Sequence, residues 1–150
     1  MTKTYLQNLV MNMFGDAGLD PAFGCAIIEH ESRWNANARS PASASDEKYG
    51  GAWGLCQILL TTAKDLGYKG DGPGLWDPKT NVDLFMKLTY RNIHNLHIVS
   101  ISDLIAAHNS GKTYNNSPAS TRNEYVPQVL DLYRKWNITC GTLGSGHTST

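Results

Sequence analysis

A glutamate that lies on an apolar helix face can serve as a general acid, and segment 26–35 contains a candidate. At about 100° per residue, Glu31 of a helix projects over the apolar side chains of Ile27 and Ile28. Glu29, two residues earlier, points to nearly the opposite face. A carboxyl lodged against apolar side chains is desolvated, which raises its pKa toward the range that a general acid needs. We therefore predict that Glu31 is catalytic, with the alternative that both glutamates are solvated helix residues.

Several helices are needed to position this carboxyl. Asp20 followed by Pro21 predicts the start of its own helix, because Asp caps free amides and Pro fits the first helical position. Apolar side chains at helical spacing predict helices over residues 5–14, 21–33, 78–93 and 123–136. A further helix is expected to begin at Ser102 as its cap and to run into His108. Since no segment alternates convincingly, the predicted fold is all-α, or α+β at most through a minor hairpin.

The chain has 150 residues, 41% of them hydrophobic, which suits one soluble domain with its own core. We assign this domain to residues 1–136 and expect residues 137–150 to form a flexible C-terminal tail. Residues 36–51 predict a long loop, rich in Ala, Ser, Asn and Gly. Because loops beyond about 12 residues are usually functional or mobile, this loop is expected to cover a cleft or to move.

Charge excludes some classes of partner. The 13 basic residues balance the 13 acidic residues and are scattered along the chain, which leaves no basic surface for nucleic acid. No segment approaches the length of a membrane span, so we expect no membrane insertion.

The cysteines do not suggest a disulfide framework. Cys25, Cys56 and Cys140 are an odd number without paired spacing, and we expect free thiols. His30 or His108 could partner a catalytic cysteine, but Cys25 lies in an apolar helical pattern where a small buried residue is the commoner role. Metal-ligand spacing is also missing, so we expect neither a metal nor another cofactor.

Four separated motifs occur in a specific order. They are Glu31-Ser32 followed by an aromatic residue and Asn35, then Gly-Leu-Cys-Gln at 54–57, Ala-His-Asn-Ser-Gly at 107–111, and Thr-Arg-Asn-Glu-Tyr-Val at 121–126. Together they resemble the lytic transglycosylase domain related to goose-type lysozyme. Each motif alone is weak, whereas four in this order within one short helical chain are fairly specific. The resemblance covers about residues 22–136.

This resemblance implies a lysozyme-like helical domain that cleaves the β-1,4 bond between N-acetylmuramic acid and N-acetylglucosamine in peptidoglycan. Glu31 falls on the family's catalytic glutamate. In such enzymes the acid protonates the leaving oxygen, and the 2-acetamido group of the sugar stabilises the cationic centre. The carboxylate then takes the proton of the sugar's own 6-hydroxyl, which closes a 1,6-anhydro ring.

The resemblance also implies substrate-binding residues. Gln57 and Asn109 match the amides that bind sugar and acetamido groups, and Ser32 matches a hydroxyl near the acetamido group. Tyr125 matches the tyrosine whose hydroxyl orients the glutamate. His108 stands where Tyr is common, so a stacking surface persists while its hydrogen bonding becomes sensitive to pH.

Two other functions remain open. The loop before Gly54 carries Asp46 and Glu47, and a goose-type muramidase that hydrolyses the bond would need one of them as a second carboxylate to activate water. The domain could also be a peptidoglycan-binding or virion structural module without turnover.

The N-terminal ten residues lack the apolar run of a signal peptide. An enzyme of this class that is made in the cytoplasm needs a holin, a phage virion or a secretion system to reach the cell wall. We therefore expect a phage-encoded protein that acts on peptidoglycan strands as a monomer.

Overall fold

The computed structural model describes residues 1–40 and 50–145, with the backbone alone for 142–145. Within these residues the fold is helical, as predicted, and its α-helices are α1 (Lys3–Asp16), α2 (Pro21–Ser32), α3 (Leu60–Asp65), α4 (Pro78–Leu96), α5 (Ile101–Ser110) and α6 (Val126–Ser145). Three short helical turns are η2 (Pro73–Trp76), η3 (Tyr114–Asn116) and the π-helical η4 (Thr121–Tyr125). A small antiparallel sheet has the order β1 (Arg39–Ser40), β2 (Ala52–Trp53), β3 (Ile58–Leu59). The predicted loop over 36–51 thus contains β1, and residues 41–49 lie outside the described part.

Local capping explains where the main helices begin. Asp20 accepts a hydrogen bond from the backbone N–H of Ala22 at 3.0 Å, which confirms the predicted start of α2. The prediction that Ser102 caps α5 is wrong. Ser100 accepts from the N–H of Asp103 at 3.2 Å instead, so that Ser102 lies inside the first turn.

The last helix also differs from its prediction of 123–136. Residues 121–125 form a π-helical turn, and α6 then continues through Ser145. The helix continues beyond Trp136 because the Trp136 ring packs on Trp34, with the ring centroids 5.7 Å apart. In addition, no Pro follows Trp136 in the sequence to end the helix. The division into a domain of residues 1–136 and a tail of 137–150 stays a prediction, although residues 137–145 are helical.

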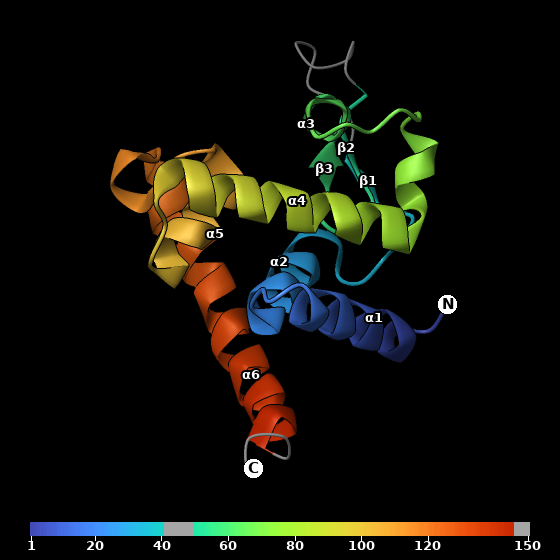
Figure 1. Cartoon of the computed structure of the whole chain (residues 1–150). Coiled ribbons are helices and arrows are strands. Elements are labelled where there is room, and N and C mark those ends of the chain that lie inside the picture. The colour runs from blue at the N-terminus through green and yellow to red at the C-terminus, as the bar shows by residue number, and fades with distance from the viewer. Residues whose placement is uncertain (41–49, 146–150) are drawn as a thin grey trace.

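Helix α2 lies at the centre of the molecule and packs mainly against α6 and α1 (Figure 1). Residues 22–28 of α2 are buried almost completely. Phe14 of α1 lies so close that a Cβ on Gly24 would come within 2.9 Å of its ring, so only glycine permits this approach. The Phe14 ring also meets Phe85 of α4 edge-on, with centroids 5.0 Å apart. These contacts fix α2, and with it Glu31, relative to α4.

A buried amide joins the small sheet to α4. Asn81 is 0% exposed, and its Nδ2 donates to the backbone oxygens of Trp53 and Leu75, both at 2.9 Å. Its Oδ1 accepts from the N–H of Cys56 at 3.0 Å. Gly54, at φ 74°, has room for no side chain, because a Cβ would lie 2.4 Å from Asn81 Nδ2. Asn81 therefore holds the turn between β2 and β3 against α4.

We predict that Asn81→Asp destabilises the fold by about 3 kcal/mol or more, because two buried carbonyls lose their donor and a charge is buried. Denaturant unfolding measures this change. The control is Asn95→Asp, an exposed position on the same helix, which should cost about 0.5 kcal/mol at most. Equal losses in the two variants would contradict the role given to Asn81.

Candidate active site

A cavity of about 250 Å³ lies where α2, α4, α5 and the small sheet meet. The structure brings four of the sequence-predicted residues into its wall, namely Glu31, Gln57, His108 and Asn109. The rest of the described wall is mostly apolar, with Ala52, Ile58, Leu59 and Leu88, and adds the hydroxyls of Ser40 and Thr62. Among the described residues that line it, Glu31 is the one carboxylic acid.

Glu31 lies at the last turn of α2, half-buried. Desolvation by burial raises the pKa of its carboxyl above the ordinary value of 4.5. Two smaller effects oppose this shift of the pKa, first the hydrogen bond from Tyr125 and then the charge of the neighbouring His30. Burial has the largest effect, so the carboxyl keeps its proton to a higher pH than an exposed glutamate does.

Tyr125 reaches this carboxyl from the π-helical turn η4. Its hydroxyl donates to Glu31 Oε2 at 3.1 Å, which leaves Oε1 without a partner among the described residues. Burial, together with the charge of Glu31, raises the pKa of Tyr125 well above its ordinary value. The phenol therefore stays protonated and remains a donor. The Tyr125 ring also meets the His30 ring edge-on, with the two centroids 4.8 Å apart, and this contact further fixes the Tyr125 side chain.

Glu29 has a different environment. Its Oε1 accepts hydrogen bonds from the indole N–H groups of Trp34, at 3.4 Å, and Trp136, at 3.3 Å. The alternative that both glutamates are merely solvated is therefore wrong. Glu29 therefore connects the end of α2 to α6. Of the two glutamates, Glu31 is the one that lines the cavity.

The backbone around the site contains uncommon conformations. Arg33 and Trp34, which follow the acid, have φ values of 51° and 67°, and Gln57 has φ 54°. Left-handed conformations in non-glycine residues occur preferentially at functional sites, where the surrounding structure holds them. The two at Arg33 and Trp34 turn the chain away at once after Ser32, so the acid stands at the very end of its helix.

Two side-chain amides face the cavity. Gln57 Nε2 donates to the backbone oxygen of Gly54 at 2.9 Å, and its Oε1 accepts from Ser40 Oγ at 2.5 Å. Asn109 Oδ1 accepts from Thr121 Oγ1 at 2.7 Å. Both amides are thus fixed by partners that belong to other elements.

His108 lines the cavity but carries no charge at neutral pH. Burial lowers its pKa to about 4, with an opposing effect from a hydrogen bond to the Cys56 backbone. Its ring meets Phe85 edge-on at 5.0 Å. The sensitivity to pH that we expected for the hydrogen bonding of His108 therefore lies below the neutral range.

Ser32 does not reach the cavity wall. Its hydroxyl donates to the backbone oxygen of Ile28 at 3.1 Å within α2, and the residue is buried. Cys56 is also buried completely. Burial raises the pKa of the Cys25 and Cys56 thiols, which keeps them protonated, and all three cysteines are free, as predicted. A Cys-His hydrolase thus receives no support.

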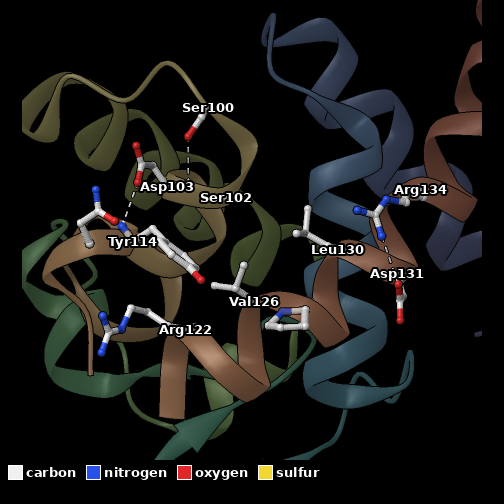
Figure 2. A pocket seen from close by; sticks show the side chains of 11 residues that line it. Ser100, Ser102, Asp103, Tyr114, Arg122, Val126, Leu130, Asp131 and Arg134 are labelled. Carbon is white, nitrogen blue, oxygen red and sulfur yellow. Dashed lines mark hydrogen bonds and ion pairs between the residues drawn. The ribbon is translucent and has the colours of Figure 1, made fainter. Parts of the chain in front are cut away.

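A larger cavity, about 490 Å³, is lined by residues of α5, η3, η4 and α6 (Figure 2). The carboxyls in its described wall already have partners, since Asp131 pairs with Arg134 at 3.2 Å and Asp103 accepts from the N–H of Tyr114 at 2.8 Å. Arg122 also lines this cavity, and its buried Nε has no hydrogen-bond partner among the described residues. Because both carboxyls there already have partners, the smaller cavity around Glu31 is the candidate active site.

Sequence reasoning missed several contributors to the site. Ser40, Thr62 and Thr121 carry no local chemical signature, although Thr121 stands four residues before Tyr125 within a recognised motif.

Asp46 and Glu47, the candidates for a second carboxylate, lie outside the described residues. Among the described residues, no group of three or more His, Cys, Asp or Glu side chains is arranged to hold a metal ion. In that same part of the chain, helices long and apolar enough to cross a membrane are absent.

A half-buried carboxyl that is bonded by a tyrosine in a cavity wall of a helical domain is compatible with glycosidase chemistry. A family model, Transglycosylase SLT domain, matches residues 13–128, and the chain belongs to this family. The protein is accordingly a peptidoglycan lytic transglycosylase. No solved structure matches the chain significantly.

We predict that Tyr125→Phe raises the pKa of the Glu31 carboxyl further, because the lost hydrogen bond is one that lowers this pKa. Carbon NMR titration of the carboxyl measures the shift directly. An activity that needs protonated Glu31 should then persist to higher pH. Tyr114→Phe, in the wall of the larger cavity, is the control and should leave the pKa of Glu31 unchanged. A lower pKa of Glu31 in Tyr125→Phe would refute the assignment.

Proposed function

We propose that Glu31 acts as the single acid and base of a lytic transglycosylase, which cleaves the β-1,4 bond between N-acetylmuramic acid and N-acetylglucosamine and leaves 1,6-anhydro ends. The observation that carries this proposal is the burial of Glu31, which raises its pKa, in the wall of a cavity with neutral amides. A carboxyl with a raised pKa is suited to give a proton near neutral pH. Oε1, which has no partner among the described residues, is the oxygen available for this proton.

The proposed reaction has two steps. Glu31 first gives its proton to the glycosidic oxygen, the bond from this oxygen to C1 of the muramic acid breaks, and the leaving sugar departs as an alcohol. The carbonyl oxygen of the 2-acetamido group bonds to C1 in its place. Glu31, now a carboxylate, then removes the proton of the 6-hydroxyl, and O6 displaces the acetamido oxygen from C1. The carboxyl regains its proton, and no water is consumed.

The neutral surroundings of Glu31 favour this cycle. An inverting hydrolase needs a second carboxylate about 6.5 to 9.5 Å from the acid to activate water. Glu31 is the one carboxylate among the described residues that line the cavity. Tyr125 remains hydrogen-bonded to Oε2 while Glu31 loses and regains its proton, so the side chain can keep one position through both steps.

Removal of the acid tests its role. We predict that Glu31→Gln keeps the fold and lowers lysis of purified peptidoglycan by at least about 10²-fold, because the amide retains the shape but cannot transfer the proton. Loss of turbidity measures lysis, and circular dichroism checks the fold. The control, Glu29→Gln, changes a carboxyl that bonds two indoles outside the cavity and should retain most of the activity. More than about a tenth of wild-type lysis in Glu31→Gln would exclude the assignment.

The product distinguishes ring closure from hydrolysis. We predict that the digest contains 1,6-anhydro ends, which mass spectrometry separates from hydrolytic products because these are heavier by one water. The double variant Asp46→Asn, Glu47→Gln should then keep most of the activity, since ring closure requires neither carboxylate. Reducing ends in the digest, together with an inactive double variant, would instead identify a goose-type muramidase. Binding to peptidoglycan without soluble products would support a module without turnover.

Phage origin and delivery to the wall by a holin, virion or secretion system stay part of this proposal, as does a monomeric state.

A neutral chain with balanced charges is consistent with a glycan substrate, because neutral sugars are bound through hydrogen bonds and apolar contacts rather than through charge.

A further inference from the structure

Two consecutive residues of α2 contact one tyrosine at two different points. Glu31 Oε2 accepts the hydrogen bond from the Tyr125 hydroxyl at 3.1 Å, and the His30 ring meets the Tyr125 ring edge-on, with the centroids 4.8 Å apart. Neighbouring residues of a helix project about 100° apart, so they can hold the hydroxyl and the ring of one side chain at once. The proposed reaction depends on the contact at the hydroxyl and gives His30 no role.

The His30 ring is itself held in one orientation. Its Nε2 lies 3.0 Å from Gln128 Oε1, and with the amide oxygen facing the imidazole it is Nε2 that donates. A half turn of the ring about its bond to Cβ would bring a carbon to the place of Nε2 and break this bond. Gln128 follows Tyr125 by three residues, a spacing that puts both side chains on one face of a helical segment. The imidazole is therefore in contact with two side chains of the same short segment.

The imidazole is not placed to act as a second acid or base. A general acid or base must lie within about 2.6 to 3.2 Å of the atom it serves, or reach it through one water. His30 Nδ1 is buried and has no hydrogen-bond partner among the described residues, and Nε2 is engaged by Gln128. His30 is not among the described residues that line the cavity of Glu31, and lines another cavity of about 450 Å³ together with Lys3 and Arg33. An effect of His30 on the reaction must therefore pass through Tyr125 or through charge.

We propose that His30 is a positioning residue, which holds the Tyr125 ring so that the hydroxyl stays on Glu31 Oε2 and Oε1 remains free for the glycosidic oxygen. Gln128 supports this role because it fixes the imidazole. Without the ring contact the phenol leaves Oε2 more often, and the carboxyl then spends less time in the position from which it transfers its proton. Binding of the glycan does not change, since His30 lies outside the described wall of the cavity. The inference rests on the proposed function, because it takes Glu31 as the acid.

The experiment compares two substitutions that both remove the charge of His30. His30→Ala also removes the ring, whereas His30→Phe keeps an aromatic ring. Release of soluble products from uncross-linked peptidoglycan strands gives kcat and KM for each variant. His30→Ala should lower kcat by about 3- to 10-fold and change KM by less than about 2-fold, because the lost aromatic contact acts on the reaction and not on binding. His30→Phe should return kcat to within about 2-fold of the wild type, since the ring contact is restored.

The pKa of the Glu31 carboxyl, measured by carbon NMR titration, separates the effect of the ring from that of the charge. The hydrogen bond from Tyr125 and the charge of His30 both lower this pKa. Both variants lack the charge, and His30→Ala should in addition weaken the tyrosine bond, so the Glu31 pKa should be higher in His30→Ala than in His30→Phe. A mere loss of stability would not move the pKa of the folded protein. Equal pKa values in the two variants, or equal kcat values, would overturn the proposal.

Two further variants cover the substitution itself and the folding. His94→Ala, at an exposed position in the last turn of α4, is the matched control and should leave kcat and the Glu31 pKa unchanged. If His30→Ala does not fold, the exposed Gln128→Ala carries the test. This variant frees the imidazole, so it should lower kcat by about 2- to 5-fold and raise the Glu31 pKa. Wild-type values of both quantities in Gln128→Ala would then overturn the proposal.

Failure of the proposed function has a different signature. Full lysis by Glu31→Gln would reject the role of Glu31 as the acid, whereas the Glu31 pKa in the His30 variants does not depend on activity. Loss of lysis in Glu31→Gln, combined with equal values in the two His30 variants, would leave the proposed function intact and reject only this inference.

Discussion

The geometry of the cleft depends on the buried amide of Asn81. Its three hydrogen bonds join α4 to β2, to η2 and to the turn that carries Gln57. This turn has a left-handed glycine at Gly54 and a left-handed non-glycine residue at Gln57, so its own backbone preference does not hold it in place. Each buried backbone group that lost its partner would cost about 1 to 3 kcal/mol. One side chain therefore fixes a wall of the cavity that local propensity alone could not form.

Burial of Glu31 in the cavity wall favours its protonated form, so that ionisation of the carboxyl costs stability. Because burial raises its folded pKa above the ordinary 4.5, this group stabilises the fold fully below that value and loses the contribution as the pH rises through its folded pKa. Above its folded pKa the ionised carboxylate is a cost to stability. The hydrogen bond from Tyr125 reduces this cost, since it favours the charged form. The tyrosine thus limits how far the pKa rises and keeps the carboxyl able to serve as acid and then as base.

Local signals in the sequence sufficed for the framework and for the position of Glu31. Asp20 caps α2 as predicted, and the helical phase alone placed Glu31 on an apolar face. The contacts that organise the site are not local. Glu29 bonds Trp136, and Asn109 bonds Thr121, across intervening helices whose packing no periodicity specifies. The order of motifs, through a family resemblance, supplied the amides and the tyrosine. It did not supply the π-helical turn, or the bond of the Ser32 hydroxyl to the backbone oxygen of Ile28 in its own helix.

The π-helical turn η4 gives a structural reason for the four-residue spacing between Thr121 and Tyr125 in the last motif. Such turns are rare, weaken the regular helical ladder and occur frequently at functional sites. Here Thr121 and Tyr125, four residues apart, both bond residues of the cavity wall. Thr121 bonds Asn109 of α5, and Tyr125 bonds Glu31 of α2. Arg122, between them in the chain, faces the larger cavity on the other side. A single turn thus orients both the Glu31 carboxyl and the Asn109 amide in the cavity wall. Because the two groups share one support, a displacement of η4 would move both of them together.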